Sequence, residues 1–133
     1  MVDPSPPPAS PLGSLLVIDD EAMMVRAIQR LLAGEYELVS TTDPAEAIER
    51  IRRGDRFDAI LCDLMMPAVS GMAVYESIRR IDAAQARRIV FMTGGAFTPR
   101  ALEFLASVAN PCVEKPLDRI SLRAALQALA PKS

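Results

Sequence analysis

Residues 15–24 read LLVIDDEAMM, so that four apolar residues run directly into three acids. The apolar run has the length and composition of a buried strand, which puts Asp19, Asp20 and Glu21 at its carboxyl end. Two like charges about 4 Å apart repel by up to about 4 kcal/mol at the effective dielectric of a protein edge. We therefore expect a cation to lie among these acids.

The composition is that of one globular domain. The 133 residues are half hydrophobic and suffice for a single core. The net charge of −2 gives no electrostatic reason to expect a nucleic-acid or anionic-membrane partner, and no apolar run approaches the roughly 20 residues of a membrane span. The first residues lack the apolar core of a signal peptide, so we expect a cytoplasmic protein.

The absence of histidine narrows the possible chemistry. It excludes Ser-His-Asp and Cys-His catalysis and argues against a zinc site. Cys62 and Cys112 fall within or beside apolar strands, where a free thiol behaves as a small hydrophobe, and no disulfide is expected.

Residues 1–13, MVDPSPPPASPLG, contain five of the eleven prolines. This composition predicts a proline-rich linker or tail that contributes nothing to the core. The folded domain is then expected to span residues 14–131. A tether to a larger protein and an untidy native terminus both remain open for the first segment.

Short apolar runs alternate with stretches of helical periodicity through residues 14–131. Five strands alternating with five helices predict an α/β fold with a parallel sheet covered on both faces. Helix starts are marked by Asp43-Pro44, with Glu46 as a capping-box acid, by Thr98-Pro99 and by Asp118. The expected strands are residues 15–19, 37–41, 59–62, 88–92 and 112–114.

The residues after the strands carry the candidate chemistry, because ligands bind beyond the carboxyl ends of parallel strands. Asp63 follows the third strand, Thr93 the fourth and Lys115 the fifth. Carboxylates without histidine or thiolate suit Mg²⁺, while a lysine and a threonine suit phosphoryl oxygens. The assembly predicts phosphoryl transfer with a carboxylate as the nucleophile. Taken singly, each of these residues is explained by a helix cap or a turn, so the prediction depends on their joint placement.

These residues resemble the receiver domain of bacterial two-component response regulators. The resemblance covers residues 14–131 and rests on the motifs VIDDE, CDLMMPAVSG, MTGG and KP and on their spacing. It implies a flavodoxin-like, doubly wound (βα)5 sheet in the order 2-1-3-4-5, with the first and third strands adjacent at the topological switch point.

The resemblance also implies roles for single residues. Asp63 is expected to accept a phosphoryl group from a phosphohistidine. Mg²⁺ would be held by Asp20 directly, by Asp19 through water, by Asp63 and by the backbone carbonyl of Met65. Lys115 would pair with Asp63 and then with a phosphoryl oxygen.

Two further positions concern the switch between states. The resemblance implies that Thr93 turns its hydroxyl onto the phosphoryl group and that Pro116 follows a cis peptide bond. The family usually has Tyr or Phe three residues before the lysine, where this chain has Cys112. We expect the missing aromatic ring to weaken switching and to favour a role as a phosphate relay or sink.

The implied partner is a histidine kinase or a histidine phosphotransfer domain. Docking is expected near the first helix, where Met23 and Val25 are left near solvent if Met24, Ala27, Ile28 and Leu31 face the core. The parent chain is expected to be a hybrid histidine kinase, with a stand-alone regulator as the alternative.

Two other functions remain open. One is a degenerate receiver that docks without being phosphorylated. The other is an Mg²⁺-dependent phosphatase that uses an aspartyl phosphate, but that chemistry resembles a family needing a second Asp at the position of Met65.

Overall fold

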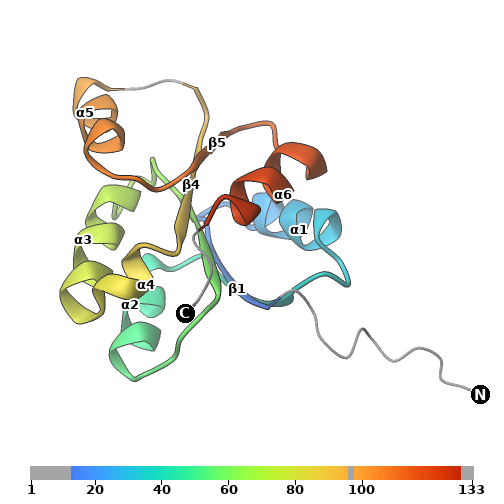
Figure 1. The fold of residues 1–133 in the computed structure, drawn as a ribbon, viewed down its shortest axis with the longest axis horizontal. Coiled ribbons are helices and arrows are strands. Elements are labelled where there is room, and N and C mark those ends of the chain that lie inside the picture. The colour runs from blue at the N-terminus through green and yellow to red at the C-terminus, as the bar shows by residue number, and fades with distance from the viewer. Residues whose placement is uncertain (1–12, 96–97, 130–133) are drawn as a thin grey trace, which may run out of the picture.

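The computed structural model describes residues 13–95 and 98–129. Apart from Gly13, the predicted linker or tail lies outside the described residues, and so do residues 130 and 131 of the predicted domain. A parallel sheet lies at the centre with helices on both faces (Figure 1). The strands are β1 (Ser14–Ile18), β2 (Glu37–Thr41), β3 (Ala59–Asp63), β4 (Ile89–Thr93) and β5 (Cys112–Glu114). The helices are α1 (Ala22–Leu31), α2 (Pro44–Arg52), α3 (Gly71–Ile81), α4 (Ala83–Ala86), α5 (Pro99–Ser107) and α6 (Arg119–Gln127).

The five strands follow the order β2-β1-β3-β4-β5, which confirms the doubly wound fold predicted from the sequence. Each neighbouring pair is parallel, and Ile18 at the end of β1 lies opposite Cys62 of β3. The carboxyl ends of β1 and β3 therefore lie side by side at the point where the strand order reverses.

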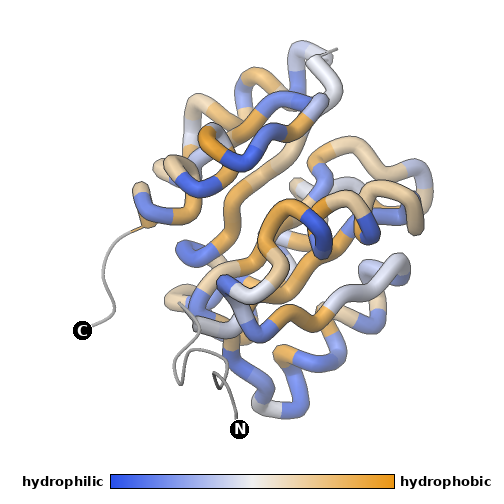
Figure 2. Tube along the Cα trace, turned by 90° about the vertical axis from the view of Figure 1, so that its right-hand side faces the viewer, coloured by the Kyte–Doolittle hydropathy of each residue, from blue (hydrophilic) through white to orange (hydrophobic). Residues whose placement is uncertain are grey.

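The sheet has a separate hydrophobic core on each face. Along β1, Leu15 and Val17 pack on the side of α1 and α6, while Leu16 and Ile18 pack on the side of α2, α3 and α5. Successive side chains of a strand point to opposite faces, so a strand covered on both faces is apolar at every position. Figure 2 shows this as continuously hydrophobic strands between helices with alternating hydropathy.

One helix of the structure was not expected. The short helix α4 precedes β4 and begins where Asp82 accepts hydrogen bonds from the backbone N–H groups of Ala84, at 2.9 Å, and Gln85, at 3.3 Å. Four residues are too few to show helical periodicity, which explains why the sequence pattern did not reveal it.

The predicted helix caps are present with one difference. Asp43, Thr98 and Asp118 each accept a hydrogen bond from a backbone N–H of the first turn. Glu46 does not complete a capping box, because its carboxylate accepts a hydrogen bond of 2.5 Å from the hydroxyl of Thr41. The same Thr41 oxygen accepts the N–H of Asp43 and so replaces Glu46 in that role.

No helix in the two described stretches has the length and apolarity that crossing a bilayer requires.

Candidate functional site

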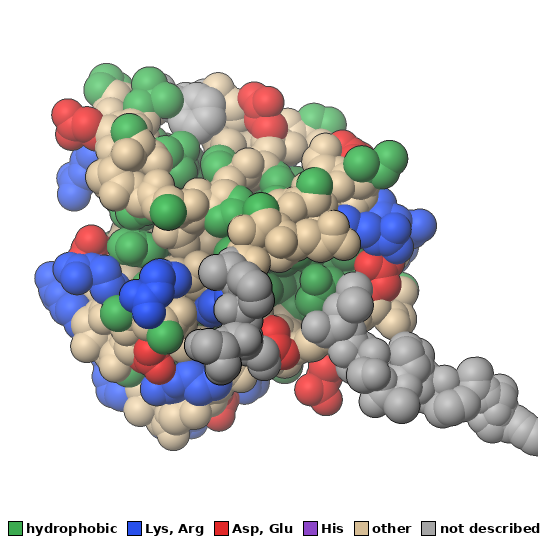
Figure 3. Space-filling model, in the orientation of Figure 1, with side chains coloured by type: hydrophobic (Ala, Val, Ile, Leu, Met, Phe, Trp, Pro, Cys, Tyr) green, Lys and Arg blue, Asp and Glu red, His purple; other side chains and the backbone are tan. Residues whose placement is uncertain are grey.

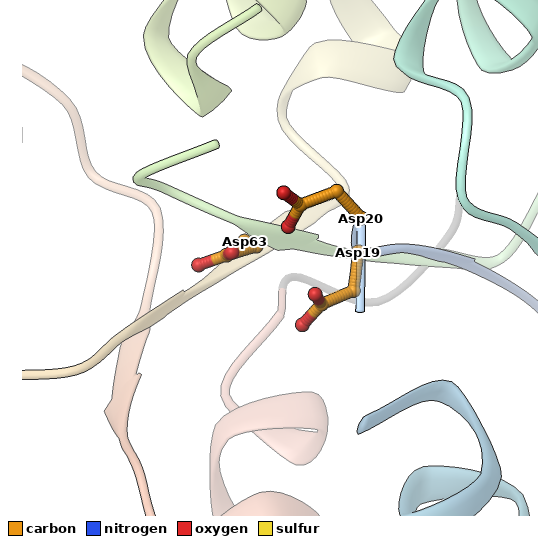
Figure 4. Close-up of side chains that lie close together, drawn as sticks. All are labelled: Asp19, Asp20 and Asp63. Carbon is orange, nitrogen blue, oxygen red and sulfur yellow. The ribbon is translucent and has the colours of Figure 1, made fainter. Parts of the chain in front are cut away.

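The carboxyl ends of β1 and β3 bring three aspartates together. Asp19 and Asp20 directly follow β1, and Asp63 is the last residue of the neighbouring β3. One carboxylate oxygen from each lies within 4.8 Å of the others. Figure 4 shows the three carboxylates around a common space. The pairing of these strands thus assembles the cluster that the strand-end pattern predicted.

The aspartates differ in their access to solvent. Asp19 is fully buried, Asp63 is 5% exposed and Asp20 is exposed. Asp19 accepts a hydrogen bond of 2.9 Å from the N–H of Glu21, and Asp63 accepts a longer one of 3.4 Å from the N–H of Met65. These few donors leave oxygen lone pairs available on all three carboxylates.

Lys115 is the cation that lies among these acids. It directly follows β5, and its Nζ is 3.3 Å from Oδ2 of Asp19 and 3.5 Å from Oδ1 of Asp63. Its N–H donates to the carbonyl of Thr93, and its peptide bond to Pro116 is cis, as the resemblance implied. The ammonium group bridges the two buried carboxylates and offsets part of their mutual repulsion.

The protonation equilibria of the site follow from burial and charge. Burial raises the pKa of Asp19, although the N–H of Glu21 and the charge of Lys115 act in the opposite direction. Burial alone lowers the pKa of Lys115, but the charges of Asp19 and Asp63 outweigh it and the pKa lies above its usual value. Lys115 is therefore charged at neutral pH.

Thr93 lies at the same edge of the sheet, at the carboxyl end of β4. It is the last residue of β4, is 2% exposed, and accepts the N–H of Gly95 at 3.1 Å through its hydroxyl oxygen. Gly95 has a φ of +92°, a left-handed conformation that favours glycine. The threonine is thus placed at the predicted edge, with its hydroxyl turned to the loop after β4.

Gly71 has a structural role at the site that the sequence reasoning did not assign. A Cβ on this residue would lie 2.6 Å from the carbonyl oxygen of Asp63 and 2.8 Å from Cα of Leu64. Its N–H donates to the carbonyl of Leu64 at 2.8 Å, which folds the start of α3 back onto the end of β3. The signal was present, because this glycine ends the motif CDLMMPAVSG.

The donor set fits a hard divalent cation. Three carboxylates converge from two neighbouring strand ends, and oxygen ligands of this kind suit Mg²⁺. Lys115 is the only competing positive charge that contacts these aspartates among the described residues. The side chain of Met65 is 41% exposed beside the cluster, and the role predicted for its backbone carbonyl stays a prediction.

The predicted docking surface needs one correction. Val25 is 7% exposed and packs in the core with Ile28 and Leu32, so the prediction that it lies near solvent is wrong. The buried stripe of α1 is rotated by about one residue from the expected face, and Met23 is 76% exposed as predicted. Three residues expected to face the core are only half-buried: Met24, Ala27 and Leu31.

Cys112 also departs from expectation. Its side chain is exposed on β5, whereas Cys62 is fully buried, so only Cys62 behaves as a small core hydrophobe. β5 is an edge strand of three residues and has a single paired neighbour, which leaves Cys112 open to solvent.

Residues 15–127 match the family model described as the response regulator receiver domain. The chain belongs to this family. It is 31% identical over 114 residues to the transcriptional regulatory protein ZraR of Escherichia coli K12, an alignment that covers 85% of this chain and 25% of ZraR. The chain thus spans about a quarter of that relative.

Solved structures of receiver domains agree with the fold. A receiver domain protein from Clostridium thermocellum superposes with a TM-score of 0.76 and 25% identity, covering 87% of this chain and 92% of the other. The receiver domain of the sensor histidine kinase PA1611 from Pseudomonas aeruginosa PAO1, solved with a magnesium ion in its active site cleft, gives a TM-score of 0.74 and 26% identity. That alignment covers 88% of this chain and 96% of the PA1611 domain. The chain is a receiver domain of the two-component type.

Proposed function

We propose that Asp63 accepts a phosphoryl group from a phosphohistidine of a histidine kinase or histidine phosphotransfer domain. The observation that carries this proposal is the position of the Asp63 carboxylate, within 4.8 Å of Asp19 and Asp20 and 3.5 Å from the ammonium of Lys115. In the transfer, a carboxylate oxygen of Asp63 forms a bond to phosphorus as the phosphorus–nitrogen bond of the donor breaks. The donor imidazole keeps the electron pair and takes up a proton.

Mg²⁺ would be held by Asp19, Asp20 and Asp63, with the backbone carbonyl of Met65 as a further ligand. When bound, the ion supplies charge neutralisation for the phosphoryl oxygens. The carboxylate of Asp19 is buried and that of Asp20 faces solvent, and one oxygen of each lies within 4.8 Å of the other. An ion between them would have ligands on the protein side and on the solvent side, which supports this assignment. The magnesium ion in the similar PA1611 domain supports the choice of metal.

Lys115 and Thr93 would respond to the new charge. Lys115 already contacts Asp63 and would transfer one contact to a phosphoryl oxygen. The Thr93 hydroxyl would exchange its bond with the N–H of Gly95 for one to the phosphoryl group. Because Cys112 is small and exposed, we propose that this movement is weakly transmitted and that the domain serves mainly as a relay or sink.

The partner would dock on α1 beside the site, where Met23 offers an exposed apolar side chain. A hybrid histidine kinase remains the proposed parent chain, with residues 1–13 as part of its tether. The likeness to the receiver domain of a sensor histidine kinase supports this origin.

The test is incubation with acetyl phosphate and Mg²⁺ followed by intact mass spectrometry. The wild-type chain is expected to gain one phosphoryl group, and Asp63→Ala is expected to gain none. Asp55→Ala serves as the matched control, since Asp55 is an exposed acid that precedes β3, lies outside the aspartate cluster and pairs with Arg50. Labelling of Asp63→Ala would refute the proposed role of Asp63. Labelling of the wild-type chain in a reaction that contains a chelator from the start would refute the proposed role of the metal.

A docking-only receiver predicts no labelling from either acetyl phosphate or a phosphorylated histidine phosphotransfer protein. A phosphatase predicts continuous release of phosphate instead of a stable labelled species. Both outcomes are distinguishable from the stoichiometric gain expected here.

A further inference from the structure

Arginine is concentrated in one part of the chain that the phosphoacceptor site does not use. Eight of the thirteen arginines lie between residues 50 and 88, and that stretch contains four acids apart from Asp63. The stretch therefore carries a local positive charge within a chain of net charge −2. Figure 3 shows many of the Lys and Arg side chains in blue at the lower left, over α2, α3 and α4.

These arginines lie near the ends of α2 and α3 and in the segments before β3 and β4, at the amino edge of the sheet where the strands begin. The segment from α2 to β3 is joined to the segment from α3 to β4 by several hydrogen bonds. Gln85 accepts the N–H of Phe57 and donates to its carbonyl, both at 2.9 Å. Arg56 donates to Asp82 at 2.7 Å, and the Nε of Arg88 donates to the carbonyl of Asp58 at 2.8 Å.

Some of the arginines on this surface are already paired. Four make ion pairs with neighbouring acids, and these pairs are Arg50–Asp55 at 3.2 Å, Arg52–Glu49 at 2.7 Å, Arg56–Asp82 at 2.7 Å and Arg79–Glu76 at 3.0 Å. Arg53, Arg80 and Arg87 are exposed, and none of their side chains has a hydrogen bond or ion pair to a residue that the structure describes. We call these three residues and the paired arginines around them the basic edge.

Helix ends explain only part of this charge. Arginine is favourable in the last turn of a helix, because a helix C-terminus carries about half a negative charge. α2 and α3 both end at this edge, so together they account for about one unit of negative charge. Positive charge remains in excess after these two ends are counted.

We propose that the basic edge binds an acidic segment of a protein partner. A guanidinium group offers a planar fork of donors that matches a carboxylate, and three such groups here have no protein partner among the described residues. The acids interspersed on the surface, such as Glu49 and Asp55, suit discrete carboxylates better than a continuous phosphate backbone. The basic edge lies at the end of the sheet opposite the aspartate cluster, so a partner bound there leaves Asp63 accessible.

The test measures binding of a fluorescent peptide of glutamate and serine to the purified chain at physiological ionic strength. Combining Arg53→Glu, Arg80→Glu and Arg87→Glu is expected to weaken binding at least about tenfold, since each exposed charge pair contributes up to about fivefold. The matched control combines Arg26→Glu, Arg30→Glu and Arg100→Glu, three exposed arginines on α1 and α5 with no described partner. Both variants change the net charge equally, so the difference between them reports the location of the site.

Equal loss of binding in both variants, or no binding by the wild-type chain, would overturn the proposal. A single-stranded oligonucleotide of equal charge provides the second arm. Tighter binding of the oligonucleotide than of the peptide at the basic edge would replace the acidic-protein proposal with a nucleic-acid one. Labelling of Asp63 by acetyl phosphate is expected to be unchanged in both arginine variants, which also shows that they are folded.

Discussion

The two edges of the sheet arrange their charges in opposite ways. At the carboxyl edge, Asp19, Asp20 and Asp63 converge on one space with Lys115 as the single cation in contact with them among the described residues. At the amino edge, four of the arginines form ion pairs with neighbouring acids, and Gln85 joins two segments through buried hydrogen bonds.

The pKa values express this difference. Burial raises the pKa of Asp19 at the carboxyl edge, so folding disfavours its charged form. At the amino edge, the slight burial of Asp82 acts to raise its pKa, but the N–H groups of Gln85 and Ala84 and the charge of Arg56 hold it below its usual range. The charge of Asp82 is thus stabilised by its neighbours, whereas the charge of the buried Asp19 remains unfavourable and is one that a metal ion can offset.

The largest expected effect on stability is at the amino edge. Gln85→Leu removes both hydrogen bonds to the backbone of Phe57 and is expected to lower the free energy of unfolding by about 3 kcal/mol, since two buried polar groups lose their partner. Urea denaturation measures this change. Gln29→Leu is the control, because the side chain of Gln29 is exposed and makes one marginal bond of 3.5 Å. A similar loss in both variants would contradict the special role of Gln85.

The second effect links packing to chemistry at the carboxyl edge. Gly71→Ala puts a Cβ against the backbone of Asp63 and Leu64, and is expected to cost about 2 kcal/mol of stability and to slow phosphoryl labelling. Gly54→Ala is the control, with a φ of +111° and no atom within 4 Å of the added Cβ. It is expected to cost about 1 kcal/mol through backbone strain and to leave labelling unchanged. If Gly71→Ala were labelled at the wild-type rate, the packing of Gly71 against Asp63 would have no role in phosphoryl transfer.

A direct comparison of the edges uses one aspartate from each. Asp82→Ala removes the cap of α4 and the partner of Arg56, and is expected to lower stability by about 1 kcal/mol. Asp63→Ala removes a like charge and is expected to cause no loss in metal-free buffer. Thermal unfolding with a chelator present tests both. If Asp63→Ala were less stable than Asp82→Ala, repulsion among the carboxylates at the carboxyl edge would not be destabilising the fold.

The smallest expected effect is the pH dependence of the stability that Asp82 contributes. The folded pKa of Asp82 lies below its unfolded value, so its carboxylate stabilises the fold above the ordinary range of aspartate near about pH 4. This stabilisation is lost as the pH falls through the lowered pKa. The stability difference between wild type and Asp82→Ala is therefore expected to shrink as the pH drops from about 5 to about 3, where both proteins can be compared by urea denaturation. A difference that grows on acidification would contradict this assignment.

Local patterns in the sequence were sufficient for most of the sheet and its active edge. Short apolar runs alternating with helical periodicity predicted the strands, and the residues at the ends of these runs predicted Asp19, Asp63 and Lys115 at one edge. The error on Val25 arose because a rotation of α1 by one residue leaves the spacing of its apolar residues nearly unchanged. The exposure of Cys112 was missed because three strand residues cannot reveal that their strand lies at the edge.

The sequence by itself determined the alternation of strands and helices, the family resemblance and the identity of the acids at the strand ends. Only the tertiary structure decided that Lys115 also contacts Asp19, that the Thr93 hydroxyl accepts a hydrogen bond from Gly95, and that Gln85 connects the segments before β3 and β4. The reason is physical. Periodicity and capping are set by neighbours along the chain, whereas contacts between residues as far apart as Asp19 and Lys115 depend on the order and register of the strands that bring them together.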